Sequence, residues 1–290
     1  MKSFLSFIRW PLLVAFLCAN CVAHPFSQEI LEEPKASNQN VIAAFLYFST
    51  EVVPVTDSLV LSLRADRGLT LAADGTVSQW ANGVSNQAAT VVETGLAPVF
   101  LASDSSMNGR PSVVFSAGGM EYLNLTLGDQ VTYFVALRHS LSGVHVITEH
   151  GEDTNSTNAG GMYLASGNTN TSAFRRGPGT FGTTMSTRDA DANWATTNEA
   201  LYVTVQYGGA DASHIVRING VQPSLLAVFT NNPTGSVTAS FYFGGRPRPI
   251  VPGEFLYMEG AIAEILVYDR ALTLDEIQNV ENYLSKRYRP

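Results

Sequence analysis

The sequence predicts an all-β sandwich of two antiparallel sheets that ends in a single helix. From residue 57 onward, short runs rich in β-branched and aromatic residues alternate with clusters of Gly, Asn, Asp, Ser and Pro, which is typical of strands joined by turns. No helical segment separates these runs, so the strands are expected to form two facing antiparallel sheets. Only the last stretch, "TLDEIQNVENYLSKRY", repeats apolar residues at helical spacing.

Composition supports a packed core and limits the classes of partner. Of the 290 residues, 45% are hydrophobic and 14% are charged, so the chain can bury enough apolar surface to fold. The net charge is −8 and the basic residues are scattered, which argues against a nucleic-acid partner.

The N-terminal segment reads as a secretory signal over residues 1–23, followed by a polar tether or arm over residues 24–56. Two basic residues precede an apolar stretch, and small residues precede His24. Asn20 interrupts the apolar stretch before it reaches the ~20 residues that a membrane span needs. Both cysteines, Cys18 and Cys21, fall inside this segment. We therefore expect a secreted, extracellular or periplasmic protein whose mature chain has no disulfide and no membrane span.

The body of the protein, residues 57–290, is expected to form one domain. Within it, Trp80 alternates with Val77 and Gln79 and is interpreted as a core residue. Asn219-Gly220 lies between two apolar runs, and this dipeptide favours the type I′ turn of an antiparallel hairpin. The predicted strands are 59–64, 76–81, 98–101, 111–115, 121–125, 131–138, 143–149, 161–165, 171–175, 200–206, 213–219, 237–243 and 260–268.

The terminal helix is expected to begin after Thr273, because Thr273 and Glu276 have the spacing of a capping box. Apolar residues then recur on one face and predict an amphipathic helix that docks on the sandwich. Basic residues follow in the last turns, where they complement the helix dipole. The apolar stripe is Ile277, Val280, Leu284 and Tyr288, and the basic residues are Lys286, Arg287 and Arg289.

Several stretches resemble the bacterial laminin-G-like family of concanavalin A-type jelly rolls. They are "LSLRADRGLTLAADGTVSQWANGVSNQAAT", "NGRPSVVFSAGGMEYL", "FYFGGRPRP" and "MEGAIAEILVYDRALTLDEIQNVENYLSKRY". The resemblance implies a jelly-roll sandwich closed by a strand and a capping helix. In that family a Trp-Asp pair often follows the second strand, whereas here Trp80 is followed by Ala81 and Asn82. The resemblance further implies scaffold roles for Gly260, Glu264, Tyr268, Asp269, Arg270 and Leu272.

Catalytic patterns are weak in this sequence. Glu149, Glu152 and Asp153 cluster in "TEHGEDTNS", but that stretch reads mostly as a loop and lacks the paired carboxylates of sandwich glucanases. His145 and His150 differ by an odd number and would point to opposite faces of a strand, which disfavours a zinc site. No Gly-x-Ser-x-Gly elbow occurs.

Calcium is the one cofactor that the sequence suggests. Asp189, Asp191 and Asn193 stand at alternate positions, like the first ligands of a calcium loop. Trp194 and Ala200 stand where an EF-hand needs Gly and Glu, so that particular loop is excluded. The alternative is a solvated acidic turn.

Carbohydrate is the partner that the region 150–199 favours. Trp194 lies in a polar loop where its ring could stack on a sugar or be buried under the loop. Amides, guanidinium groups and further rings surround it, and they suit a hydroxylated ligand. We therefore predict a secreted, non-catalytic, lectin-like module, with a polysaccharide lyase or glycosidase and an adhesive module for extracellular protein as alternatives. The proposed ligand-binding residues are Tyr163, Arg175, Arg176, Phe181, Asn193 and Trp194.

Three Asn-x-Ser/Thr triplets begin at Asn124, Asn155 and Asn170. Such triplets accept glycans in a eukaryotic secretory pathway. They also arise readily by chance in a sequence this rich in Asn and Thr.

Overall fold

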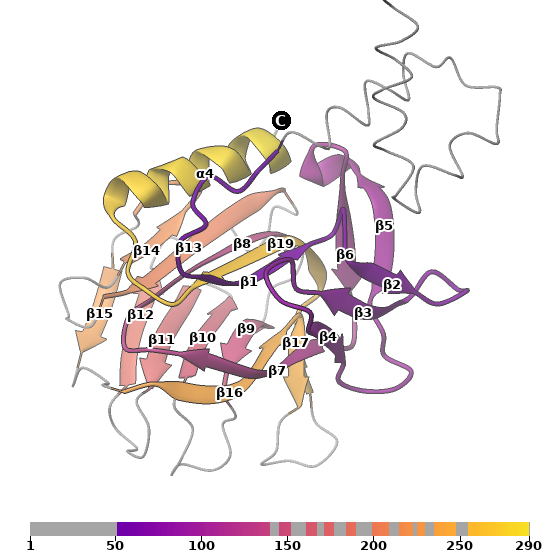
Figure 1. The fold of residues 1–290 in the computed structure, drawn as a ribbon, viewed down its shortest axis with the longest axis horizontal. Coiled ribbons are helices and arrows are strands. Elements are labelled where there is room, and N and C mark those ends of the chain that lie inside the picture. The colour runs from indigo at the N-terminus through magenta and orange to yellow at the C-terminus, as the bar shows by residue number, and fades with distance from the viewer. Residues whose placement is uncertain are drawn as a thin grey trace, which may run out of the picture. The chain divides into compact units, whose positions relative to one another are not determined.

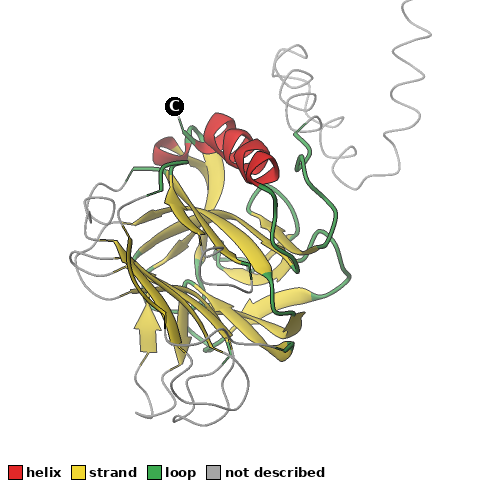
Figure 2. Cartoon of the chain, turned by 90° about the vertical axis from the view of Figure 1, so that its left-hand side faces the viewer, coloured by secondary structure: helices red, strands yellow, loops and turns green. Residues whose placement is uncertain are grey.

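The fold is a sandwich of two antiparallel sheets with a helix on the outer side of one of them (Figure 1). Figure 2 shows the helix lying over one sheet while the other sheet lies on the far side. This arrangement confirms the predicted fold class. The computed structural model describes residues 51–139, 145–151, 161–166, 171–176, 184–189, 199–208, 215–222, 225–229, 235–247 and 255–289.

The seven-stranded sheet is built around a strand from the end of the chain. This strand, β19 (Gly260–Tyr268), pairs along its length with β8 and divides its other side between β1 and β6. All nine residues of β19 are buried, so the "GAIAEILVY" run is a central strand. The neighbours, in order, are β14 (Ile215–Ile218), β13 (Leu201–Tyr207), β8 (Val131–His139), β19, β6 (Arg110–Phe115) and β5 (Val99–Asp104), with β1 (Leu59–Arg64) on β19.

The ten-stranded sheet faces it across the core. A two-stranded sheet, β17 (Gly245–Pro247) with β18 (Phe255–Tyr257), contacts β9, and a short 3-10 helix, η1 (Ser105–Met107), follows β5. In order, the strands of the large sheet are β15 (Leu225–Phe229), β12 (Thr184–Asp189), β11 (Thr171–Arg176), β10 (Gly161–Ser166), β9 (His145–His150), β16 (Val237–Phe243), β7 (Met120–Leu127), β4 (Ala88–Val91), β3 (Val77–Ala81) and β2 (Leu69–Leu71).

Aromatic residues fill the space between the sheets. Trp80 is fully buried, lies edge-to-face with Phe243 at 5.8 Å between ring centroids, and donates from its indole nitrogen to the Arg64 carbonyl at 3.1 Å. Val77 is also fully buried, three residues before Trp80. A register irregularity between β2 and β3 accompanies this departure from strict alternation. The prediction that Trp80 is a core residue is confirmed.

Asn82, which follows β3, links the two sheets. Its side-chain oxygen accepts from the Ser62 amide on β1 at 2.9 Å, and its nitrogen donates to the Val60 carbonyl and to the Tyr122 hydroxyl at 3.0 and 3.1 Å. Asn82 is 3% exposed. An amide both donates and accepts, which an ionised carboxylate cannot do, so Asn82 has a structural function that depends on its amide.

The helix α4 (Leu274–Tyr288) begins with the predicted capping box. Thr273 accepts from the Glu276 amide at 3.3 Å, and the Thr273 amide donates to the Glu276 carboxylate at 2.8 Å. The apolar stripe of the helix is buried in one cluster with outward residues of β8 and β19, including Phe134 and Leu266. None of the helices in the described residues is long and apolar enough to cross a membrane.

The Asn219-Gly220 turn forms as predicted, but the hairpin does not extend. Both residues have positive φ, 53° and 78°, and Ile218 and Val221 exchange two backbone hydrogen bonds of 2.8 and 3.0 Å. This is the geometry of a type I′ turn. The pairing consists of the single bridge between Ile218 and Val221, and the next strand, β15, belongs to the opposite sheet. The prediction of two paired strands at this turn was therefore wrong beyond the turn itself.

Candidate functional site

A buried carboxylate, Glu264 of β19, contacts the inner side of α4. It accepts hydrogen bonds from Tyr283 at 3.0 Å and from Tyr288 at 2.7 Å, and the Arg287 guanidinium lies 3.6 Å away. Burial raises the pKa of Glu264 to about 7 from its ordinary value of 4.5, against the opposing effect of the nearby Arg64. A carboxyl group with this pKa is suited to act as an acid or base near neutral pH. Glu264 is only 1% exposed, however, so its carboxyl group is buried away from solvent.

Charges around this carboxylate balance one another. Asp66 pairs with Arg64 at 2.8 Å and also with Arg287, so two carboxylates face two guanidinium groups. The side chains of both arginines are at most 2% exposed. Arg287 lies in the last turn of α4, as predicted, and its ion pairs also anchor the helix to the sheet. The cluster is closed to ligands and holds the helix.

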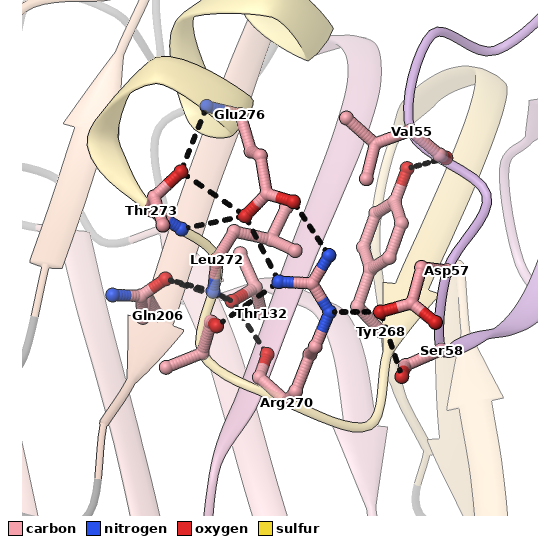
Figure 3. Close-up of polar contacts among 11 residues, drawn as sticks. Val55, Asp57, Ser58, Thr132, Gln206, Tyr268, Arg270, Leu272, Thr273 and Glu276 are labelled. Atoms are coloured by element: carbon pink, nitrogen blue, oxygen red, sulfur yellow. Dashed lines mark hydrogen bonds and ion pairs between the residues drawn. The ribbon is translucent and has the colours of Figure 1, made fainter.

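The "YDRAL" segment joins β19 to α4 through polar contacts (Figure 3). Arg270 pairs with Glu276 at 2.7 Å and with Asp57 at 3.0 Å, and Tyr268 donates to the Val55 carbonyl at 2.9 Å. The Leu272 amide donates to Thr132 on β8 and Gln206 on β13. These contacts agree with the scaffold roles implied by the family resemblance, and they fasten the helix start to the sheet.

Two further buried ion pairs join residues within the fold. Arg138 pairs with Asp104 at 2.7 Å, and Arg217 with Glu281 at 2.8 Å. Asp104, the partner of Arg138, also accepts a hydrogen bond from the Ser112 hydroxyl at 2.8 Å. Within the described residues, no group of three His, Cys, Asp or Glu side chains could hold a metal ion.

The outer face of the ten-stranded sheet carries a row of polar residues from several strands. Phe241 and Phe243 of β16 point into the core, so Tyr242 between them points outward. Tyr242 pairs with Glu121 on β7 and with Glu149 on β9. Residues directly opposite each other on neighbouring strands share a face. The register therefore aligns a carboxylate on each side of an outward tyrosine.

The side chains become more buried along this row, from β3 to β9. Thr90 and Gln79 extend it across β4 and β3, where both are exposed, and Glu121 is partly buried. Tyr242 and Glu149 are only 4% and 6% exposed although they point away from the core. The row thus runs from exposed residues on β3 and β4 to buried residues on β16 and β9. We call these aligned residues the outer-face row.

Glu149 lies within strand β9, which overlaps the predicted strand 143–149. It sits on β9 beside His150, whose ring nitrogen is 2.8 Å from the Leu125 carbonyl. His150 pairs with the core residue Phe241, so it faces inward while Glu149 faces outward. Glu149 and His150 therefore project from opposite faces of the sheet.

Part of the predicted ligand-binding set meets this row. Tyr163 on β10 is the register partner of Glu149, and its other neighbour is Phe174 on β11. Arg175 and Arg176 also lie on β11, and Asp189 is the last residue of β12. Strands were predicted at 161–165 and 171–175, where β10 and β11 lie, whereas β12 was not predicted. Phe181, Asp191, Asn193 and Trp194 lie outside the described residues.

The outer-face row has chemistry suited to hydroxylated molecules. Ionised carboxylates accept hydrogen bonds from hydroxyl groups, and a tyrosine offers both a ring face and a hydroxyl. The register that brings Tyr163 beside Glu149 depends on strand pairing, so sequence spacing alone could not reveal it. Alternation in "FYF" is the one local signal that marks Tyr242 as outward.

Comparison with known proteins shows the fold. No protein-family model matches the chain, and no curated protein matches it. Domain 4 of the extracellular arabinanase AbnA from Geobacillus stearothermophilus, solved with arabinotriose, is 16% identical with a TM-score of 0.53, covering 77% of this chain and 98% of that one. Trypanosoma rangeli sialidase with sialic acid is 13% identical with a TM-score of 0.52, covering 90% of this chain and 39% of the sialidase.

The binding domain of botulinum neurotoxin DC, solved with SialylT, is 12% identical with a TM-score of 0.52, covering 79% of this chain and 52% of that one. The present chain therefore spans almost all of the arabinanase domain but about half or less of the other two. All three similarities show a shared β-sandwich fold.

Proposed function

We propose that this chain is an exported, non-catalytic carbohydrate-binding domain. The observation that carries the proposal is the outer-face row, in which Glu121, Tyr242 and Glu149 lie on three adjacent strands and Tyr163 continues the register. The arabinanase domain and the neurotoxin domain, whose structures hold sugars, share this sandwich. Residues 1–23 would be the export signal.

In this proposal the segments around residues 150–199 complete the site beside the row. Tyr163, Arg175 and Arg176 would contribute from strands, and Phe181, Asn193 and Trp194 from the connections between them. Calcium, if it binds, would be held by Asp189, Asp191 and Asn193, since carboxylate and amide oxygens are the ligands it prefers.

Calorimetric titration tests the proposal directly. The protein would be titrated with arabino-oligosaccharides, sialylated oligosaccharides and a panel of polysaccharides, in calcium and in chelator. We expect at least one ligand to bind, and E121Q to weaken it at least ~10-fold, the equivalent of ~1.4 kcal/mol. T126S, a conservative change elsewhere on β7, is the matched control. Absence of binding across the panel would refute the proposal.

A glycoside hydrolase is the second candidate, because the two carboxylates flank one tyrosine. Adjacent strands lie ~4.8 Å apart, so two spacings place the backbones of Glu121 and Glu149 ~10 Å apart. Inverting glycosidases hold their carboxyl groups ~6.5–9.5 Å apart. An assay for new reducing ends, with E149Q as the control, would detect this activity. Turnover that E149Q abolishes would favour the enzyme over the binding domain.

A further inference from the structure

Strand β7 contains a bulge at the first of the three Asn-x-Ser/Thr triplets. Tyr122 pairs with Phe241, and Leu125 pairs with Ala239, so Leu123 and Asn124 together oppose a single residue of β16. Tyr122 and Leu125 are three positions apart, yet both are buried in the core, 4% and 5% exposed. The extra residue is what allows both to face inward.

Asn124 is the residue that the bulge presents to solvent. Its φ is 55°, in the left-handed region that Asn tolerates better than most residues. Its side chain is exposed, as is Leu123 beside it. Thr126, which completes the triplet, is also exposed, and its hydroxyl lies 2.7 Å from that of Thr238 on β16.

We propose that Asn124 is an N-glycosylation site of this protein. The triplet Asn124-Leu125-Thr126 supplies the acceptor sequence. The bulge supplies the space, because a glycan on Asn124 projects from the surface while Leu125 stays in the core. No core residue has to move to accommodate the modification.

The reaction is a group transfer from a lipid pyrophosphate-linked oligosaccharide, catalysed by an oligosaccharyltransferase. The side-chain amide nitrogen of Asn124 forms a bond to the anomeric carbon of the first sugar, and the bond between that carbon and the pyrophosphate oxygen breaks. The lipid pyrophosphate leaves with the electron pair, and the amide loses one proton. No oxidant or reductant is required.

The test is glycopeptide mapping of the full chain secreted from eukaryotic cells behind a host secretory leader. We expect a glycan on Asn124 in most secreted chains, and we expect it to persist when Asn155 and Asn170 are both changed to Gln. N124G should lose it while keeping the left-handed backbone conformation, which glycine adopts freely.

Changes at position 126 separate the acceptor sequence from the fold. T126A should abolish the modification and T126S should retain it. T238A removes the same hydroxyl contact as T126A but leaves the triplet intact, so it should remain glycosylated. An unmodified Asn124 peptide from the secreted protein would overturn the proposal, as would a T238A variant that loses the glycan together with T126A.

Discussion

Replacing Glu264 with Gln should change how stability depends on pH. The amide has nearly the same shape as the carboxyl group but cannot ionise. In the wild-type protein, burial raises the pKa of Glu264 to about 7 from an ordinary value of 4.5. The folded state therefore holds a proton that the unfolded state releases, and the resulting stabilisation is full below pH ~4.5 and is lost as the pH rises through ~7.

The size of this effect follows from the two pKa values. Between pH 5 and pH 8, the linkage relation gives a loss of ~2.5 kcal/mol in the free energy of unfolding of the wild type relative to E264Q. Urea denaturation at several pH values, followed by the fluorescence of the buried Trp80, measures this difference. The slopes of free energy against urea concentration should be equal for the two proteins.

E276Q is the matched control, because it also replaces a glutamate with an amide, in this case within the first turn of α4. Hydrogen bonds from Arg270 hold the pKa of Glu276 down at about 2, so this group stays ionised in the folded state from pH 5 to 8. E276Q should therefore follow the wild-type pH profile over that range. Parallel profiles for wild type and E264Q, within ~0.5 kcal/mol, would refute the assignment of Glu264.

Three further changes probe the scaffold, each by urea denaturation. W80A should cost ~3–5 kcal/mol, since it opens a cavity beside Phe243 and leaves the Arg64 carbonyl without its indole donor; a loss below ~1 kcal/mol would contradict the packing. N82A should cost ~2–3 kcal/mol because the buried Ser62 amide loses its acceptor, and equal stability would show that Asn82 does not link the sheets. T273A should cost ~1 kcal/mol through the lost cap, and a variant as stable as wild type would contradict it.

Strong local patterns made most strands predictable. The runs 59–64, 237–243 and 260–268 match β1, β16 and β19 residue for residue, because apolar and aromatic side chains in these runs are fixed by burial. Strands β2 and β4 were missed because three or four residues are too few to show a period. Strand β12, "TMSTRD", is polar, and it is a strand because β11 and β15 bond to its backbone on both sides.

The candidate site was less predictable than the fold, for a physical reason. Glu149, Tyr242 and Glu121 come from three segments whose alignment depends on register across β9, β16 and β7. A shift of one residue would turn each side chain to the other face. Sequence reading selected Tyr163 as a ligand residue but had no means of placing it beside Glu149.

The position of β19 has a consequence for biosynthesis. Because this strand separates β8 from β6 and also holds β1, a nascent chain that has emerged only as far as residue 259 cannot close the smaller sheet. The ribosome must synthesise the chain through β19 before the edges of β8 and β6 are covered. Until then the unpaired edges of the emerging chain are open to pairing with another molecule, the kind of exposure from which chaperones protect nascent chains.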